Sequence, residues 1–244
     1  MKIVIGQGSC GIASGAKKTE AEFRRLIQEK NLDAAVTIAG CIGSCYLEPI
    51  VDVYGDDGSL SRYVHMTADK VAAVVDEHIA GKKPVKEYLI PEDGSAFLSK
   101  QTRIALKNCG VINPEDINDY IASGGYQAVR KALFEMDGEA ICREVEKSGL
   151  RGRGGGGFPT GKKWVQVRSQ AEPVKYIVCN GDEGDPGAFM DRSVMEGDPH
   201  KMLEGMLIAG IATGAQVGYI YVRAEYPLAV HRLRIAIAQA EEAG

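Results

Sequence analysis

The stretch SGLRGRGGGGFPTGKKW, residues 148–164, contains seven glycines and four cationic side chains in seventeen positions. Its composition fits three interpretations: a flexible linker, a phosphate-binding loop of a nucleotide site, or a basic arm. The net charge of −4 argues against a general nucleic-acid binder, because such a protein needs a surplus of lysine and arginine to neutralise phosphates. The neighbouring segments decide between the linker and the phosphate-binding loop.

Two familiar glycine patterns occur in this stretch, and neither has the context that it needs. Gly152-x-Gly154-x-x-Gly157 matches the dinucleotide fingerprint, which follows a strand, whereas a helix is expected immediately before it, over residues 139–147. The spacing G-x-x-x-x-G-K also occurs, but Lys163 stands where a P-loop requires serine or threonine for magnesium. A standard nucleoside triphosphate site is therefore not expected.

The chemistry of the stretch still favours an anion. Its arginines and lysines flank glycines whose bare backbone lets an anion come close to the amide groups. Phe158 and Trp164 offer flat apolar faces on which a ring could stack. An anion attached to an aromatic ring describes a nucleotide cofactor.

Two later segments supply further walls for such a pocket. A strand expected over residues 174–179 runs into NGDEGDPG, residues 180–187, and a second strand over 217–223 runs into the end of YIYVRAEY, residues 219–226. Open α/β sheets bind ligands at the carboxyl ends of their strands. Carboxylates and Asn180 there can bind ribose hydroxyls and ring N–H groups, although a solvated acidic turn is the alternative.

The chain divides into two expected α/β domains. Residues 1–80 alternate short strands (2–5, 34–38, 49–54 and 60–65) with a helix opened by a capping box of Thr19 and Glu22 and a later helix over 71–79, which predicts a small thioredoxin-like domain. Residues 81–99 are expected to be a linker. The domain over residues 100–244 is mostly helical before the glycine stretch (114–122, 126–134 and 139–147) and afterwards pairs its two strands with helices over 200–213 and 227–243.

The hydropathy of the chain and an N-terminus too short for a signal peptide predict a cytoplasmic location. No apolar run approaches the roughly 20 residues that span a bilayer. Disulfides are rare in that compartment, so metal binding or simple burial is expected for the cysteines. They are Cys10, Cys41, Cys45, Cys109, Cys142 and Cys179, of which the last three are expected to be buried small residues.

Taken together, RGRGGGGFPTGKKW, CNGDEGDPG and YIYVRAEYP resemble the NADH- and FMN-binding subunit of respiratory complex I and related flavoprotein subunits of soluble NAD-linked hydrogenases and formate dehydrogenases. The resemblance covers roughly residues 95–244. The N-terminal domain, with GCIGSCYLEP, looks like the thioredoxin-like [2Fe-2S] ferredoxin module that precedes this subunit in many soluble members. The resemblance implies an incomplete α/β flavin- and NADH-binding domain after the linker.

The resemblance also implies roles for individual residues. Asp185 stands where the family usually has a glutamate near the nicotinamide, and Ala224 replaces a common glycine. Phe158 would stack on the NADH adenine, and Tyr221 and Glu225 match later flavin and nucleotide contacts. The residues that would contact or hold FMN are Gly152, Arg153, Gly154, Gly155 and Lys163, chiefly at its phosphate, with Asn180, Asp182 and Glu183.

The implied activity is that of an NADH dehydrogenase, in which hydride passes from the nicotinamide to FMN and electrons then pass singly to iron–sulfur centres. No catalytic side chain is required, because the cofactor carries the reaction. A [2Fe-2S] cluster normally takes four cysteines, whereas this chain offers Cys10, Cys41 and Cys45, with Gly15 where another thiol could sit. Either a non-cysteine ligand completes the site, or the domain has lost its cluster and serves for docking.

Family members continue well past Gly244 into a part that carries a [4Fe-4S] motif, so the chain is expected to be an N-terminal fragment with little or no activity alone. The expected partners are iron–sulfur subunits of a multisubunit complex of the hydrogenase, formate dehydrogenase or complex I type, with neither nucleic acid nor membrane insertion. The alternative function is a non-enzymatic ferredoxin-like relay or docking module.

Overall fold

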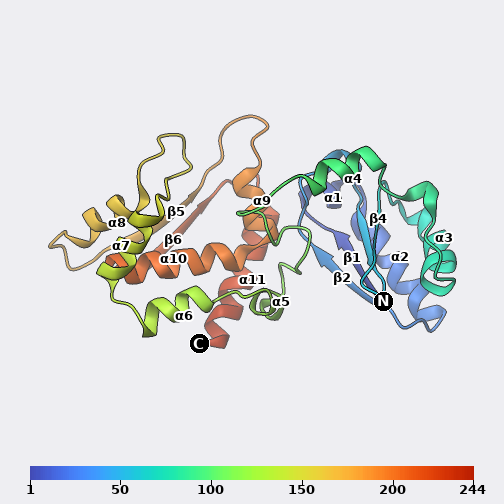
Figure 1. Cartoon of the computed structure of the whole chain (residues 1–244), viewed down its shortest axis with the longest axis horizontal. Coiled ribbons are helices and arrows are strands. Elements are labelled where there is room, and N and C mark those ends of the chain that lie inside the picture. The colour runs from blue at the N-terminus through green and yellow to red at the C-terminus, as the bar shows by residue number, and fades with distance from the viewer. The chain divides into compact units, whose positions relative to one another are not determined.

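A computed structural model describes residues 1–244, and they form two compact units (Figure 1). The first unit comprises residues 1–119 and 193–198, and the second comprises residues 120–192 and 199–244. Two helices, α5 (Ile117–Ala122) and α9 (Met190–Gly197), contribute residues to both units. None of the helices in the chain is both long enough and apolar enough to span a membrane.

The first unit is built on a four-stranded mixed sheet with the strand order β2-β1-β3-β4. The central strand β1 runs parallel to β2 and antiparallel to β3, and β3 and β4 are also antiparallel. The strands are β1 (Lys2–Gly6), β2 (Ala35–Ala39), β3 (Val51–Tyr54) and β4 (Leu60–Tyr63). This arrangement confirms the expected small thioredoxin-like α/β fold, with strand ends that differ from the predicted ones by one or two residues.

Helices complete the first unit. Phe23, Leu26 and Ile27 of α2 share one apolar core with Val71 of α3 and with the side chains of β1 and β3. The helical segments are α1 (Ser9–Ala13), α2 (Ala16–Glu29), η1 (Cys45–Leu47), η2 (Ala68–Lys70), α3 (Val71–Ala73), η3 (Val74–Ala80), η4 (Lys86–Tyr88) and α4 (Glu92–Ser99). The apolar periodicity of residues 71–79 thus corresponds to the continuous helical run of α3 and η3.

The capping box predicted at Thr19 and Glu22 is wrong. Helix α2 begins earlier, at Ala16, after Gly15 with a φ of 101°, a left-handed conformation that glycine adopts without strain. Thr19 is therefore an interior residue, and its hydroxyl donates a hydrogen bond of 2.6 Å to the carbonyl oxygen of Met66. The hydroxyl fastens the helix to the core and does not cap it.

Residues 81–99, the expected linker, contain two short helices and a segment that packs on the core of the first unit. Val85 is buried in that core, and its backbone N–H donates to the hydroxyl oxygen of Tyr63 at 3.1 Å. The backbone N–H of Ile90 donates to the carbonyl oxygen of Arg62 at 2.9 Å. This part of the chain is thus attached to strand β4.

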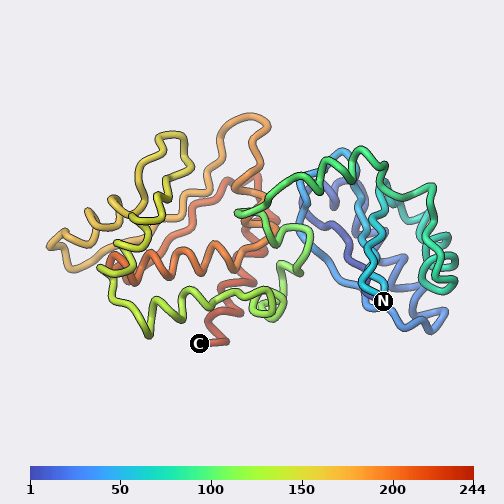
Figure 2. The backbone as a smooth tube through the Cα atoms, viewed as in Figure 1, coloured from blue at the N-terminus to red at the C-terminus, as the bar shows by residue number.

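The second unit surrounds the helix α10 (Pro199–Thr213), and its chain path can be followed in Figure 2. Helix α10 packs against α6, α7, α8 and α11 and against both strands of the unit. The strands β5 (Tyr176–Gly181) and β6 (Val217–Val222) form a parallel pair, as the alternation of strands and helices predicted. The remaining helices are α6 (Gln127–Phe134), α7 (Gly138–Ser148), α8 (Thr160–Arg168) and α11 (Pro227–Ala243).

Trp164, whose ring was a candidate for stacking on a ligand, is partly buried. It packs against a small apolar cluster that includes Ile141, Cys142 and Ala212.

Tyr176 and Tyr219 lie on neighbouring strands with their ring centroids 6.0 Å apart, and both remain more than half exposed. One face of the two-stranded sheet is therefore open and aromatic.

Candidate functional site

The glycine stretch forms a hairpin loop between α7 and α8. The backbone N–H of Gly152 donates to the carbonyl oxygen of Phe158 at 2.9 Å, and that of Thr160 donates to Leu150 at 2.9 Å. The Arg151 guanidinium donates to the carbonyl oxygen of Gly157 at 3.1 Å, across the base of the loop. These bonds hold the loop closed at its base, so residues 153–156 form a defined tip and not an unstructured linker.

The tip of this loop is open. Gly155 and Gly157 have φ values of 96° and 59°, which disfavour a residue with a side chain. A Cβ atom added at Gly154, Gly155 or Gly156 would meet no heavy atom within 4 Å. The backbone amides at the tip are thus reachable by a ligand, as an anion-binding loop requires.

Charged and aromatic side chains accompany the loop. Arg153 is exposed at its tip, and Lys163 is exposed in the first turn of α8. Phe158 is 45% exposed, so one face of its ring is available for stacking. The side chains expected to contact the phosphate and a ring are therefore all exposed, and they lie on one short segment.

The carboxyl ends of β5 and β6 lie side by side, because the two strands are parallel and Asn180 pairs in register with Tyr221. The loops that follow are joined by Arg223, whose guanidinium donates to the backbone carbonyl oxygen of Glu183. The same guanidinium lies 3.3 Å from a Glu225 carboxylate oxygen and 3.9 Å from one of Asp182. The structure thus brings together the two strand-end segments that the sequence singled out.

Arg223 itself was not among the predicted site residues. It stands inside YIYVRAEY, between the expected contacts Tyr221 and Glu225, and a lone cation among strand-end carboxylates is the signal that could have identified it. A hydrogen bond from its own backbone N–H, together with the Arg223 guanidinium, lowers the pKa of Glu225 below its usual value. Glu225 therefore stays ionised beside Arg223.

Glu183 has a structural role in addition to the expected flavin contact. Its buried carboxylate accepts hydrogen bonds from the backbone N–H groups of Met190 at 2.6 Å, Asp191 at 3.0 Å and Arg192 at 3.2 Å. These are the first amides of α9, which have no partner within the helix. Glu183 therefore closes the loop after β5 by capping the helix that follows.

The other predicted site residues lie near the carboxyl ends of β5 and β6. The Asn180 side-chain oxygen accepts from the backbone N–H of Asp182 at 2.9 Å, which forms a tight turn directly after β5. Asp185 and Ala224 are exposed in the two loops, and Tyr221 is 59% exposed on β6. In the view of Figure 1, the glycine loop and the loop after β5 extend to the same side of the second unit.

This arrangement fits a flavin nucleotide in its donor chemistry. An exposed glycine loop with two cations suits a phosphate, and the polar ends of two parallel strands suit the ring and the ribityl hydroxyls. No pair of side chains here is arranged as a nucleophile and its base. The site can bind and orient a cofactor that brings its own reactivity.

The first unit holds the cysteine cluster that the sequence predicted. The thiol sulfur atoms of Cys10, Cys41 and Cys45 all lie within 4.8 Å of one another, and Cys10 and Cys41 are 3.2 Å apart. A hydrogen bond to Cys41 and burial raise the pKa of the Cys10 thiol, and burial raises that of Cys45. Three converging thiols fit a thiolate-ligated metal centre.

Cys109 and Cys142 are fully buried, as expected for small apolar residues, and Cys179 is partly buried on β5. None of the three joins the thiol cluster. Burial and the nearby Asp191 carboxylate raise the pKa of the Cys179 thiol. The Cys179 thiol is therefore neutral, and all three cysteines are packing residues outside the cluster.

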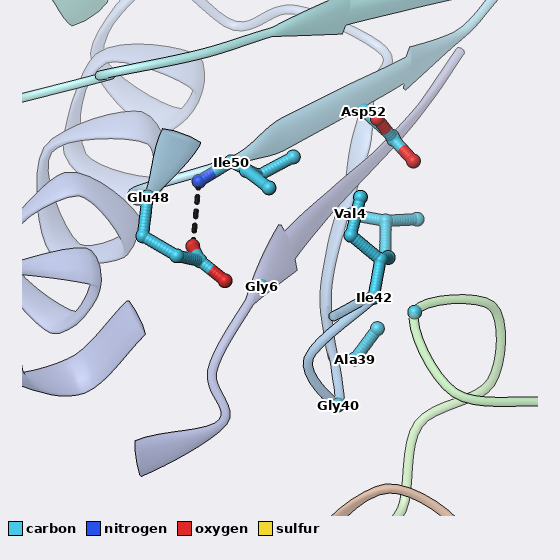
Figure 3. Close-up of a pocket in the computed structure, with 9 residues that line it drawn as sticks. Val4, Gly6, Ala39, Gly40, Ile42, Glu48, Ile50 and Asp52 are labelled. Atoms are coloured by element: carbon cyan, nitrogen blue, oxygen red, sulfur yellow. Dashed lines mark hydrogen bonds between the residues drawn. The ribbon is translucent and has the colours of Figure 1, made fainter. Parts of the chain in front are cut away.

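Glu48 is a polar residue of this region that the sequence reasoning missed. Its carboxylate accepts from the backbone N–H of Ile50 at 2.8 Å and points toward Gly6 at the end of β1 (Figure 3). Burial raises the pKa of this carboxyl to about 7. Its place three residues after Cys45, in a segment otherwise rich in apolar side chains, was the available signal.

Part of the chain is similar to a known protein family. Residues 145–244 match the family model described as the Nuo51 FMN-binding domain. The match contains the glycine loop, both strands and all of the strand-end residues described above. It confirms, for this part of the chain, the resemblance to the FMN-binding subunits of complex I and its relatives.

Individual relatives agree with this class. The chain is 55% identical over 145 residues to the NADP-reducing hydrogenase subunit HndC of Solidesulfovibrio fructosivorans, a match that covers 59% of this chain and 29% of that protein. It is 48% identical over 141 residues to an NADH-quinone oxidoreductase subunit of Rhizobium meliloti, covering 58% of this chain and 34% of the relative. The matches thus span about a third of each relative's length.

A solved structure is also similar along the chain. An NAD+-reducing [NiFe]-hydrogenase in the air-oxidized state is 25% identical in sequence, with a TM-score of 0.46. The match covers 99% of this chain and 41% of the hydrogenase chain.

Proposed function

We propose that this chain is part of an NADH:acceptor oxidoreductase subunit, in which its second unit binds FMN and NAD(H). The observation that carries this proposal is the parallel pair β5 and β6, whose carboxyl ends are joined through Arg223 and lie in one unit with an open glycine loop. The match of residues 145–244 to the Nuo51 FMN-binding domain supports it.

In this proposal the protein binds and orients, and FMN, when bound, supplies hydride acceptance and one-electron release. The backbone amides of Gly152, Gly154 and Gly155 would hold the flavin phosphate, with Arg153 and Lys163 balancing its charge. Phe158 would stack on the adenine of NAD(H), and its half-exposed ring leaves a face for this contact.

The strand ends would hold the remainder of the flavin. Asn180 lies near the end of β5, and Asp182 and Glu183 follow that strand. Tyr221 lies near the end of β6, and Ala224 and Glu225 follow it. Asp185, one methylene shorter than the glutamate expected there, would lie nearest the nicotinamide. Because Arg223 and the α9 amides already hold Glu225 and Glu183, these groups need little reordering when the cofactor binds.

The relatives' names support the partner class. They are subunits of a hydrogenase and of an NADH-quinone oxidoreductase, so we place this chain beside iron–sulfur subunits in a multisubunit electron-transfer complex. A cytoplasmic location agrees with six cysteines that are all free thiols. A relay or docking role without flavin is not favoured, because the flavin-domain match includes every strand-end residue of the site.

Flavin titration tests the proposal directly. Because the chain spans about a third of its relatives, a form extended to their full length is titrated with FMN, and quenching of flavin fluorescence gives the dissociation constant. NADH is then added without oxygen, and the loss of visible flavin absorption is followed. Saturable FMN binding and bleaching by NADH are expected, and bound flavin that NADH leaves oxidised would refute the proposed activity.

A further inference from the structure

The thiol cluster of the first unit lacks one ligand of a common metal site. Structural zinc sites and [2Fe-2S] clusters both take four protein ligands, whereas the cluster offers the three thiols of Cys10, Cys41 and Cys45. Gly15, the position considered for another thiol, offers no side-chain donor, and the space around the place of its Cβ atom is open. A fourth donor must come from elsewhere in the first unit.

Glu48 lies where that donor is needed. One of its carboxylate oxygens is 3.8 Å from the sulfur of Cys10, and the Cys41 and Cys45 sulfurs are also 3.8 Å apart. Ligands at about 2.3 Å from a tetrahedral metal ion lie about 3.8 Å from one another. These two spacings suit metal ligation, but only the three cysteines have donor atoms that all lie within 4.8 Å of one another, so the Glu48 side chain would move toward the other two sulfurs on binding.

The surroundings of Glu48 are shaped around its carboxylate. A Cβ atom at Gly6 would come within 3.2 Å of the carboxylate oxygen Oε2, and one at Gly11 within 3.1 Å. Figure 3 shows the carboxylate of Glu48 beside Gly6, with the dashed bond from Ile50 holding it in place. Gly6 thus leaves room for the carboxylate, whereas a side chain at Gly11 would first meet the backbone oxygen of Gly6.

The charge of Glu48 is not balanced by any side chain. Asp52, a second buried acid in the same region, forms an ion pair with Arg62, with an N···O distance of 2.6 Å. Glu48 is only 6% exposed, yet it takes part in no ion pair. When Glu48 and the thiols are ionised, a bound metal ion would supply the positive charge that no side chain offers here.

A backbone amide also donates to the cluster. The N–H of Gly43 lies 3.2 Å from the sulfur of Cys41, and Gly43 has a φ of 91°. Such amide bonds to sulfur stabilise thiolates around metal centres and adjust their potentials. The loop between Cys41 and Cys45 is therefore arranged for a thiolate, the form that binds metal.

We propose that Glu48 is the fourth ligand of a metal centre held by Cys10, Cys41 and Cys45. Binding would displace one proton from each thiol to the solvent, and the carboxylate would bind in its ionised form. Binding of a single ferrous ion involves no change of oxidation state, whereas assembly of an oxidised [2Fe-2S] cluster from ferrous iron and sulfide would pass one electron from each iron to an added one-electron oxidant such as ferricyanide. The proposal is independent of flavin binding in the second unit, so either can fail without the other.

The test uses the full chain, purified without oxygen and incubated with ferrous iron, alone or with sulfide and ferricyanide. Bound iron and acid-labile sulfide, the visible absorption spectrum and the electron paramagnetic resonance of the dithionite-reduced protein are measured. The variants are Glu48→Gln, Glu48→Cys and, as a matched control on the exposed face of α2, Glu22→Gln. The iron-to-sulfide ratio shows whether the four ligands hold a cluster or a single ion.

We expect the wild type and Glu22→Gln to retain iron equally and Glu48→Gln to bind iron at least tenfold more weakly. Glu48→Cys should recover the iron content with a changed resonance spectrum, because a thiolate replaces the carboxylate. This recovery separates loss of a ligand from loss of the fold. Equal iron content and an unchanged spectrum in Glu48→Gln would overturn the proposal, as would oxidation of Cys10 and Cys41 to a disulfide without metal uptake.

Discussion

Arg223 donates a hydrogen bond through its guanidinium to the backbone carbonyl oxygen of Glu183, and this bond joins the loop after β5 to the end of β6. The Glu183 carboxylate in turn accepts hydrogen bonds from the first backbone N–H groups of α9. Glu183 is therefore held at its backbone by Arg223 and at its side chain by the helix that it caps. The two strand ends are therefore held in one arrangement before any ligand binds.

Replacing Arg223 by alanine should weaken FMN binding. The substitution releases the carbonyl of Glu183 and leaves Asp182 and Glu225 without their cation, so the carboxylates repel one another and the loop must be ordered on binding. A charge-assisted hydrogen bond contributes about 1.5–3 kcal/mol, which corresponds to a rise in the dissociation constant of roughly tenfold or more. Fluorescence titration of FMN measures the effect. Arg234→Ala, which removes an exposed arginine of α11, should leave the affinity unchanged.

Phe158→Ala should weaken NAD(H) binding more than FMN binding. The ring is half exposed on the glycine loop, and stacking on an aromatic base contributes about 0.5–1.5 kcal/mol beyond buried area, equivalent to roughly a threefold to tenfold change in affinity. Titrations with FMN and with NADH on the same preparations compare the two losses. Phe134→Ala removes a highly exposed phenylalanine of α6 as the control. Equal losses for both ligands would contradict the stacking role.

The elements of the second unit were predictable where one periodic pattern dominates. Helix α11 has the predicted bounds, and β5 and β6 lie within two residues of the predicted strands, because alternation and helical spacing are local properties. Trp164 and Glu183 were less predictable, since their partners lie on other elements. Trp164 packs against the apolar cluster that contains Ala212, and the Glu183 carboxylate caps α9.

The surroundings of the cysteine cluster were also only partly predictable from the sequence. The spacing of Cys41 and Cys45 marked two of its members, and the resemblance added Cys10, but the carboxylate of Glu48 entered only through the packing of β1 against the segment before β3. A cysteine pattern contains no information about a non-cysteine neighbour. The three-dimensional position of Gly6 and Gly11 around that carboxylate was needed to find it.

Gly155→Ala should reduce FMN affinity by straining the glycine loop. Gly155 has a φ of 96°, and holding alanine in this conformation costs about 1–2 kcal/mol, which either distorts the tip or lowers the population of its binding conformation. We expect a rise in the dissociation constant of about fivefold to thirtyfold. Gly156→Ala is the matched control, because its φ is not positive and a Cβ atom there meets nothing within 4 Å. Equal effects of the two substitutions would indicate a steric conflict with the ligand and not backbone strain.

His78 makes the stability of the first unit depend on pH. Its Nδ1 atom lies 2.8 Å from the hydroxyl oxygen of Tyr63, which accepts from the backbone N–H of Val85 and so can donate its own proton to the imidazole. This bond fits a neutral ring. Burial, followed by the positive charge of Lys82, lowers the pKa of His78 below its usual value.

The lowered pKa of His78 determines how the unfolding free energy changes with pH. Below about pH 6.5 the unfolded chain binds a proton at His78 that the folded chain does not, so the unfolding free energy decreases as the pH falls, by at most about 1.4 kcal/mol per pH unit. Above that pH the imidazole is neutral in both states and its contribution is constant. Hydrogen exchange at the β3 and β4 amides, measured from about pH 7.5 to about pH 5, should show the loss as a difference between the wild type and His78→Gln, because Glu48, with a pKa of about 7, shifts the stability of both proteins in the opposite direction. His65→Gln, at an exposed histidine of the same unit, should keep the wild-type pH dependence. A pH dependence in His78→Gln equal to that of the wild type would assign the effect to other groups.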